Sequence, residues 1–290
     1  MKRFAAALAL LALVLSGCGG TRSVAPRARA VPTYDEIASA HNARVARLDR
    51  IWSRAAVQLR FTDADGRSRR EQGEGHLQVL QPDRLALSVG KLGEVVFWLG
   101  SDSERFWWFE LGDNSAAAVA RHENAMKPCV GESPVPVHPL DLLDLLGVTA
   151  LPARSAVAPV LGPGGRVVVD VPARAGARRV YFDPQTMRPA RVELWLPGAE
   201  EPAVEATLTE YERVDVPSEG GVDPRVASRV SVRVRETGAE LVLFLSDLND
   251  GSRPGRLESF VFDFDELVGA HRPSRVVRLD EACETSADAP

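Results

Sequence analysis

The sequence is poor in the residues from which catalytic and metal sites are usually built. Its 290 residues include three cysteines and five histidines. The histidines are His41, His76, His122, His138 and His271. None of them has the spacing of metal ligands, and the Gly-x-Ser-x-Gly, phosphate-loop, His-Glu-x-x-His and Cys-x-x-Cys motifs are missing. We therefore expect a protein that is not an enzyme and that holds no metal and no cofactor.

Basic residues are in the minority. The chain has 35 lysines and arginines against 40 aspartates and glutamates, which gives a formal net charge of −5. This balance excludes the basic footprint of a nucleic-acid-binding protein. The hydrophobic content of 45% and the charged content of 26% are ordinary for a folded globular protein. The length suits one large β domain or two small domains.

The apolar run at the start of the chain is too short to span a bilayer. It covers residues 4–15, follows two basic residues and ends in Leu15-Ser16-Gly17-Cys18. A basic start, a short apolar run and small residues before a cleavage site are typical of a secretory signal peptide. The four-residue ending resembles the lipobox of bacterial lipoproteins. The alternative is an ordinary signal peptide with an incidental cysteine.

The lipobox resemblance implies how the chain is processed and where it resides. Residues 1–17 would be a signal peptide that is removed, and Cys18 would become a lipid-bearing N-terminus, acylated for example with palmitate. Gly19 stands where an aspartate often retains a Gram-negative lipoprotein in the inner membrane. We therefore expect an outer-membrane lipoprotein whose domain faces the periplasm. Residues 18–32 would form a flexible tether with a reach of about 20 Å.

Two cysteines remain if Cys18 is lipidated. Cys129 lies in the middle of the chain and Cys283 lies near its C-terminal end. In an oxidising compartment such a pair can form a disulfide, which would close a long loop and stabilise the fold by about 3–5 kcal/mol. Two unpaired thiols are the alternative, because the sequence does not fix the distance between them.

A helix is predicted directly after the tether. Thr33 and Glu36 have the spacing of a capping box, and apolar residues recur on one helical face as far as Ile51 and Trp52. We expect this amphipathic helix to end near residues 52–54. The periodicity then changes from that of a helix to the alternation that is typical of strands.

Short strand-like segments separated by turn residues make up most of the remaining chain. The first series comprises residues 56–61, 73–80, 85–89, 94–99 and 105–111. The second series comprises residues 166–171, 178–182, 191–196, 204–214, 229–234, 240–247 and 257–264. Between the two series, the alanine-rich residues 112–126 predict a helix. A short helix is predicted from Leu140 to Leu146, after His138-Pro139 and before Gly147.

These elements predict a single domain over residues 33–280, followed by a disordered tail over residues 281–290. The fold class is mainly β (α+β), with a curled antiparallel sheet of about 11–12 strands, because a continuous sheet of that length tends to curl. Asp141 and Asp144 lie three residues apart on the short helix. They could form a carboxylate pair, but a solvated helix face explains them equally well.

Aromatic residues are concentrated in the last strands of the first series. In the strand at residues 105–111, Phe106 and Trp108 point to one face of the sheet, and Trp107 and Phe109 point to the other. Because both faces are apolar, both must be covered. One face can pack under helices, and the other can either line a hollow that takes a ligand or form part of a solid core.

Taken in order, these features resemble the LolA/LolB-like superfamily of bacterial lipoprotein carriers and receptors. Three segments carry the resemblance. Residues 73–85 are similar to a strand, a turn with proline and arginine, and a second strand of that family. Residues 136–147, which begin Pro-Val-His-Pro-Leu, are similar to its mid-chain helix, and residues 182–211 are similar to its paired late strands. The resemblance covers about residues 33–265.

The resemblance implies an incomplete β-barrel with short mid-chain lid helices and an apolar cavity for acyl chains. The candidate cavity residues are Phe97, Trp98, Phe106, Trp107, Trp108, Phe109, Trp195, Phe244 and Phe262. The receptor type carries an exposed leucine in a loop between two early strands, where this chain has Leu92. That residue would insert into membranes or lipid, or else be an ordinary turn residue tucked onto the sheet. The carrier type holds its lid with an early-strand arginine, for which Arg60 is a possible match.

The sequence thus favours a membrane-anchored envelope lipoprotein that binds acyl chains and acts in lipoprotein or lipid handling at the outer membrane. Its expected partners are the acyl chains of lipids or lipoproteins, the membrane through the N-terminal lipid, and an envelope protein, with no nucleic acid. The alternative is a non-catalytic structural or interaction module of an envelope complex on the same fold.

Overall fold

The computed structural model describes residues 31–62, 65–125, 127, 137–217, 224–252 and 257–281. These residues belong to one unit that begins at Val31. The predicted signal peptide, Cys18 and the tether up to residue 30 lie outside the described residues, as do Cys129, Cys283 and the tail from residue 282 onward. In the part of the chain that is described, no helix has the length and apolar composition needed to cross a membrane.

The described residues form fourteen strands. The first six are β1 (Arg50–Thr62), β2 (Ser68–Leu80), β3 (Arg84–Lys91), β4 (Glu94–Ser101), β5 (Arg105–Glu110) and β6 (Ala116–Arg121). The others are β7 (Val160–Leu161), β8 (Val167–Ala173), β9 (Gly176–Phe182), β10 (Pro189–Trp195), β11 (Val204–Arg213), β12 (Arg225–Val234), β13 (Glu240–Asn249) and β14 (Arg275–Arg278). All of the predicted strands are therefore present except the last one, at residues 257–264.

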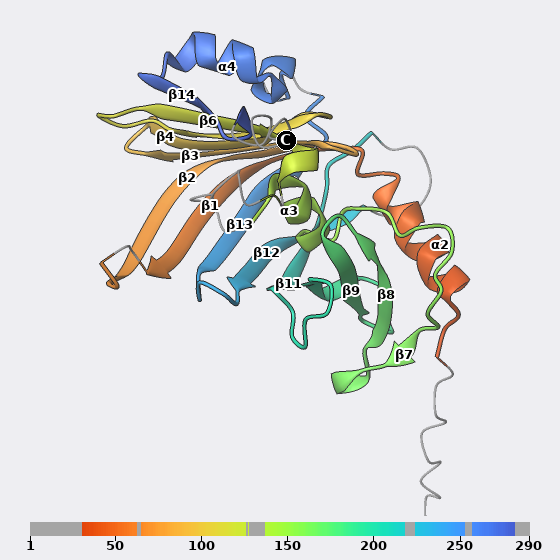
Figure 1. The fold of residues 1–290 in the computed structure, drawn as a ribbon. Coiled ribbons are helices and arrows are strands. Elements are labelled where there is room, and N and C mark those ends of the chain that lie inside the picture. Colours follow the sequence, from red (N-terminus) through yellow and green to blue (C-terminus); the bar gives the residue numbers. More distant parts are fainter. Residues whose placement is uncertain are drawn as a thin grey trace, which may run out of the picture. The chain divides into compact units, whose positions relative to one another are not determined.

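All of these strands belong to one sheet, in the order β14-β6-β5-β4-β3-β2-β1-β13-β12-β11-β10-β9-β8-β7 (Figure 1). β14 runs parallel to β6, so the sheet is mixed, whereas the β1–β2 and β1–β13 pairs at its centre are antiparallel. The edge strands β14 and β7 do not pair with each other, and the sheet is open.

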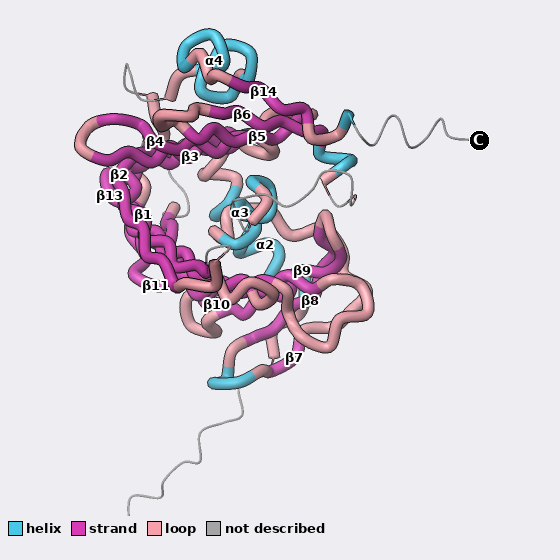
Figure 2. The backbone as a smooth tube through the Cα atoms, turned by 60° about the vertical axis from the view of Figure 1, so that its left-hand side comes forward, coloured by secondary structure: helices cyan, strands magenta, loops and turns pink. Residues whose placement is uncertain are grey.

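The predicted class, mainly β, is confirmed, but the predicted sheet of about 11–12 antiparallel strands is too small and lacks the parallel strand. The short edge strands β7 and β14 have too few residues to show an alternating pattern. The sheet bends around two helices without closing or curling strongly (Figure 2). These helices pack on its inner side and occupy the space that a closed barrel would need.

Within the described part of the chain, three α-helices accompany the sheet. They are α2 (Tyr34–Val45), α3 (Pro139–Leu145) and α4 (Phe264–His271). Short 3-10 turns form η1 (His122–Asn124), η3 (Pro163–Gly165) and η4 (Ser259–Phe262). The predicted capping box of α2 is present, with Glu36 N–H donating to Thr33 Oγ1 over 3.3 Å and Thr33 N–H donating to Glu36 Oε2 over 2.8 Å.

Two further predictions are wrong, one about where a helix ends and one about a strand. α2 ends at Val45 rather than near residues 52–54, because Ile51 and Trp52 are buried in β1 instead. Residues 257–264 do not form a strand: they form η4 and the first residue of α4. The apolar residues Val261, Phe262 and Phe264 are buried by these turns without strand pairing.

The predicted helix at residues 112–126 is also wrong, because its centre is β6. Ala118 and Ala120 pack into the inner core, whereas Ala117 and Val119 pack under α4. With both faces covered, the strand shows no alternation of polar and apolar residues, and tertiary packing overrides the helix preference of alanine.

The buried residues form two separate clusters. The inner core joins residues of both halves of the sheet to α2 and α3, for example Ile37, Leu142 and Leu243. The outer cluster lies on the other side of β3–β6, where η4 and α4 cover it with Val261, Phe264 and Leu267. The sheet therefore has an inner face with α2 and α3 and an outer face with α4 over part of it.

Candidate functional site

The short helix α3 lies on the inner face and touches both halves of the sheet. It contacts β3 and β4 on one side and β10 on the other. His138 caps its first turn by accepting the Leu140 N–H at Nδ1 over 3.1 Å, and Pro139 occupies the first position. Leu142, Leu143 and Leu145 are buried in the inner core. The short helix predicted from Leu140 to Leu146 is thus present, one residue earlier in the chain.

The two aspartates of α3 bind arginines of the sheet. Asp141 accepts two hydrogen bonds from Arg174, of 3.2 and 2.6 Å. Asp144 forms an ion pair with Arg178, whose side chain is almost fully buried. Burial raises the pKa of Asp141, and Arg174 partly offsets that effect. The two aspartates therefore form neither a solvated helix face nor a free carboxylate pair, which were the two alternatives that the sequence left open. Their contacts fix α3 to the sheet.

The segment after α3, residues 147–152, is held by hydrogen bonds to its backbone, and we call it the strap. Each of its six consecutive carbonyl oxygens accepts a hydrogen bond from a different side chain. In the order of the carbonyls, the donors are Arg44, Gln81, His41, Arg178, Asn42 and Tyr34. Four of the six donors belong to α2, so the strap ties α3 to that helix.

Two histidines beside these contacts, the buried His41 and the partly buried His138, are neutral in the folded chain. His41 donates from Nε2 to the carbonyl of Thr149 over 2.9 Å, and burial together with Arg44 lowers the pKa of His41 to about 3. Burial lowers the pKa of His138 to about 2, and Arg174 and His122 add to this effect. Because His138 accepts at Nδ1, its Nε2 carries the proton and faces Nδ1 of His122 at 3.3 Å.

The inner core becomes accessible to solvent toward the tips of β1, β3 and β4. Leu59, Phe61, Val89 and Phe97 pack against the inner core but are only partly buried. Val89 and Phe97 are cross-strand partners. These four residues, which we call the mouth, extend the apolar surface of the core to its edge. Apolar surface that stays accessible in this way is typical of binding sites for apolar partners.

Leu92 projects from the turn that joins β3 to β4. Its side chain is fully exposed, and its φ of 55° lies in the left-handed region, which a leucine rarely adopts. The preceding Lys91 is paired with Glu71 on β2. The side chain is therefore not tucked onto the sheet, which removes one of the two alternatives.

The predicted cavity aromatics do not gather at one place. Phe97, Phe106 and Trp108 face the inner core. Four others belong to the outer cluster: Trp98, Trp107, Phe109 and Phe262. Trp195 and Phe244 point to the outer face of the other half of the sheet, because their neighbours Leu194, Leu243 and Leu245 face inward. Only the first three thus share the inner side with α3.

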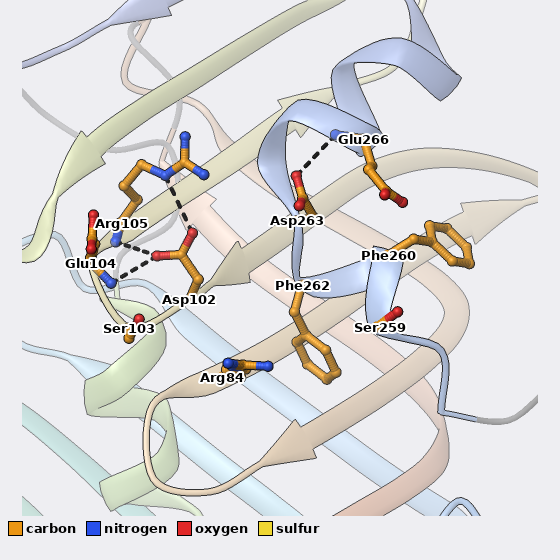
Figure 3. A pocket seen from close by; sticks show the side chains of 10 residues that line it. All are labelled: Arg84, Asp102, Ser103, Glu104, Arg105, Ser259, Phe260, Phe262, Asp263 and Glu266. Carbon is orange, nitrogen blue, oxygen red and sulfur yellow. Dashed lines mark hydrogen bonds and ion pairs between the residues drawn. The ribbon is translucent and has the colours of Figure 1, made fainter.

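A polar cleft of about 420 Å³ opens on the outer side, between the β4–β5 turn and the η4–α4 segment (Figure 3). Asp102 holds Arg105 and the turn on one wall, and Asp263 caps α4 on the opposite wall. Arg105 also reaches Asp265 over 3.2 Å. Charged side chains dominate the lining, which does not suit an acyl chain.

Sequence reasoning missed the groups that hold α3. Arg60 does not hold the helix, since it pairs with Glu240 on the neighbouring strand β13. Arg174, Arg178 and the strap donors do so instead. Their partners lie tens of residues away, and no local pattern marks them. The lipidation of Cys18 and the pairing of Cys129 with Cys283 concern residues outside those described and stay predictions.

No protein-family model matches this sequence, and no curated protein matches it significantly. Similar solved structures include a LolA superfamily protein from Nitrosomonas europaea, with 11% identity, a TM-score of 0.47, and coverage of 81% of this chain and 99% of that one. A DUF1329 family protein from Desulfovibrio piger has 12% identity, a TM-score of 0.45, and coverage of 80% and 99%.

A candidate outer membrane lipoprotein-sorting protein domain from Vibrio parahaemolyticus has 14% identity, a TM-score of 0.46, and coverage of 80% of this chain and 97% of that one. The Nitrosomonas europaea protein bears the name of the superfamily that the order of the sequence motifs resembles. At these identities, none of them assigns a function to this chain.

Proposed function

We propose that the protein is an outer-membrane-anchored lipoprotein that binds acyl chains at the mouth and acts in lipoprotein or lipid handling at the periplasmic side of that membrane. The observation that carries the proposal is the partly exposed apolar surface of Leu59, Phe61, Val89 and Phe97, which is continuous with the inner core. The lipobox-like sequence before Cys18 supplies the anchor.

Binding of this kind needs no catalytic group. Burial of roughly 10 methylene groups at about 0.8 kcal/mol each would favour the bound chain, less the cost of ordering the ligand and the protein. The strap and the two ion pairs keep α3 on the sheet. An acyl chain therefore enters along the mouth strands, and α3 forms a fixed wall rather than a displaced lid.

The test is a titration of the mature chain with a fluorescent fatty-acyl probe, in competition with a triacylated lipopeptide. Phe97→Gln is expected to weaken binding by about tenfold, because it removes apolar contact area worth 1–2 kcal/mol. Phe244→Gln is the matched control, since Phe244 is also partly buried but lies on the outer face. We expect its affinity to equal that of the unmodified chain.

Equal effects of the two substitutions would contradict binding at the mouth. Absence of saturable binding by a cooperatively folded chain would overturn the acyl-chain proposal altogether. That result would favour the alternative function, a non-catalytic interaction module of an envelope complex.

The exposed Leu92 gives a second prediction. We propose that it inserts into the acceptor membrane when a bound acyl chain is passed on. Leu92→Asp is expected to slow transfer of the probe from protein to vesicles by about tenfold, because a charge at this position opposes insertion. Affinity for the probe and thermal stability should not change, because the side chain makes no buried contact. Leu92→Met is the control, and equal transfer rates for both variants would refute the role.

A further inference from the structure

The segment between the strap and β8 is an exposed apolar loop without charge. Residues 155–165 contain no charged side chain and are bounded by Arg154 and Arg166. We call residues 154–166 the β7 loop. Its large aliphatic residues Val157, Val160 and Leu161 are 51%, 55% and 57% exposed.

Hydrogen bonds and strand pairing hold the backbone that carries these exposed residues. The Val157 N–H donates to Ser155 Oγ over 3.1 Å, and the Ser155 hydroxyl donates to the carbonyl of Asp170 over 3.0 Å. Gly162 N–H donates to the carbonyl of Arg166 over 2.8 Å. Val160 and Leu161 pair with Val168 and Val167 of β8. The loop therefore presents its apolar side chains in a fixed arrangement.

The sequence around the loop differs in charge from the whole chain. The chain carries a net charge of −5, yet residues 145–169 contain only two charged residues, Arg154 and Arg166. Aliphatic side chains that can enter the headgroup boundary, with basic side chains beside them that attract anionic lipids, favour contact with an anionic bilayer. An acidic or polar protein partner would not need the aliphatic residues.

The β7 loop lies beside the point where the chain enters the domain. Tyr34, in the first turn of α2, donates its hydroxyl to the carbonyl of Pro152 over 2.7 Å. Both views show the start of the described chain next to β7 (Figures 1 and 2). Twelve residues lie between Cys18 and Val31, which gives a reach of at most about 45 Å. A lipid on Cys18 would thus hold this side of the domain close to the bilayer.

We infer that the β7 loop is a membrane-contact surface that rests on the anionic bilayer in which Cys18 is anchored. This inference depends on the proposed lipid anchor but not on acyl-chain binding at the mouth. Val157, Val160 and Leu161 enter the interface between headgroups and acyl chains, while Arg154 and Arg166 contact lipid phosphates. The contact orients the domain relative to the membrane.

The experiment uses the acylated full chain in vesicles of phosphatidylethanolamine and phosphatidylglycerol, prepared with and without brominated acyl chains. Val160→Trp adds a fluorophore to the loop. Val276→Trp is the matched control, since Val276 is 43% exposed on β14, at the opposite edge of the sheet. Brominated lipid is expected to remove most of the fluorescence added by Val160→Trp and none of that added by Val276→Trp.

Equal quenching of the two variants would overturn the inference while leaving the anchor intact, provided that the chain floats with the vesicles. If the mass of the purified chain shows that Cys18 carries no lipid, both the proposed anchor and this inference are overturned. A third outcome would show that the loop pairs two copies of the chain instead. In that outcome the chain dimerises, the double variant Val160→Asp with Leu161→Asp abolishes the dimer, and Val160→Trp is not quenched. Binding of the acyl probe at the mouth is measured separately, and its result does not bear on this inference.

Discussion

Replacement of Arg178 by alanine is expected to lower the free energy of unfolding by about 3–5 kcal/mol, the cost of removing one partner of a buried ion pair. The Arg178 side chain is 6% exposed and binds Asp144, the hydroxyl of Thr149 and the carbonyl of Ala150. Its loss leaves the Asp144 carboxylate and one strap carbonyl buried without their donor. Urea unfolding followed by tryptophan fluorescence measures the change.

The adjacent residue Arg179 is the matched control for this prediction. It points to the outer face, where its partly exposed side chain pairs with Asp170 at 2.7 and 3.0 Å. Arg179→Ala should cost less than about 1 kcal/mol, as exposed ion pairs do. The double variant Arg178→Met with Asp144→Leu should recover part of the lost stability, because it removes the stranded charge. A similar loss for the two single variants would contradict the role of Arg178.

Acidification from pH 7 to pH 5 is expected to lower the free energy of unfolding by about 4 kcal/mol through His41 and His138. Both histidines are neutral in the folded chain, with the pKa of His41 lowered to about 3 and the pKa of His138 lowered to about 2. The unfolded chain takes up protons near pH 6.5. Stability therefore falls by about 1.4 kcal/mol per pH unit for each histidine below pH 6.5.

The surroundings of the two histidines strengthen this dependence. Arg44 and Arg178 face His41, and Arg174 and His122 face His138, so among the described residues no carboxylate compensates a proton on either ring. The raised pKa of Asp141 acts in the opposite direction, because the folded chain then binds that proton more readily.

His138→Asn isolates one of the two contributions. Asparagine keeps an acceptor at the N-cap of α3 but cannot take up a proton near neutral pH. Urea midpoints at pH 7, 6 and 5 should show about half the pH dependence of the unmodified chain. An unchanged slope in this variant would show that the acid sensitivity arises elsewhere.

The fold could be predicted from local patterns where one face of an element is exposed. The capping box of α2 and the alternation in most strands gave correct elements. The predictions failed where elements are buried on both sides or are very short. β6 has covered alanines on both faces, so its pattern resembles a helix, and β14 joins the sheet in parallel beside it over four residues.

The candidate site could be predicted only in part, for a similar reason. The alternation of Phe106 and Trp108 against Trp107 and Phe109 assigns the two faces correctly. Which face stays open to a ligand depends on the positions of α3 and α4, and no local pattern contains that information. The arginines that hold α3 belong to β9 and to the β8–β9 turn, 34 and 33 residues beyond the aspartates that they bind.

The strap also determines how the domain would respond to force. A lipoprotein is pulled through its tether when the membrane and the envelope move relative to each other. In the proposed lipoprotein, residues 18–32 would lead from the lipid into α2, whose four donors bind the strap, and the strap directly follows α3. Tension would therefore pass from the anchor to the helix that walls the inner core, before it reaches the strands of the mouth.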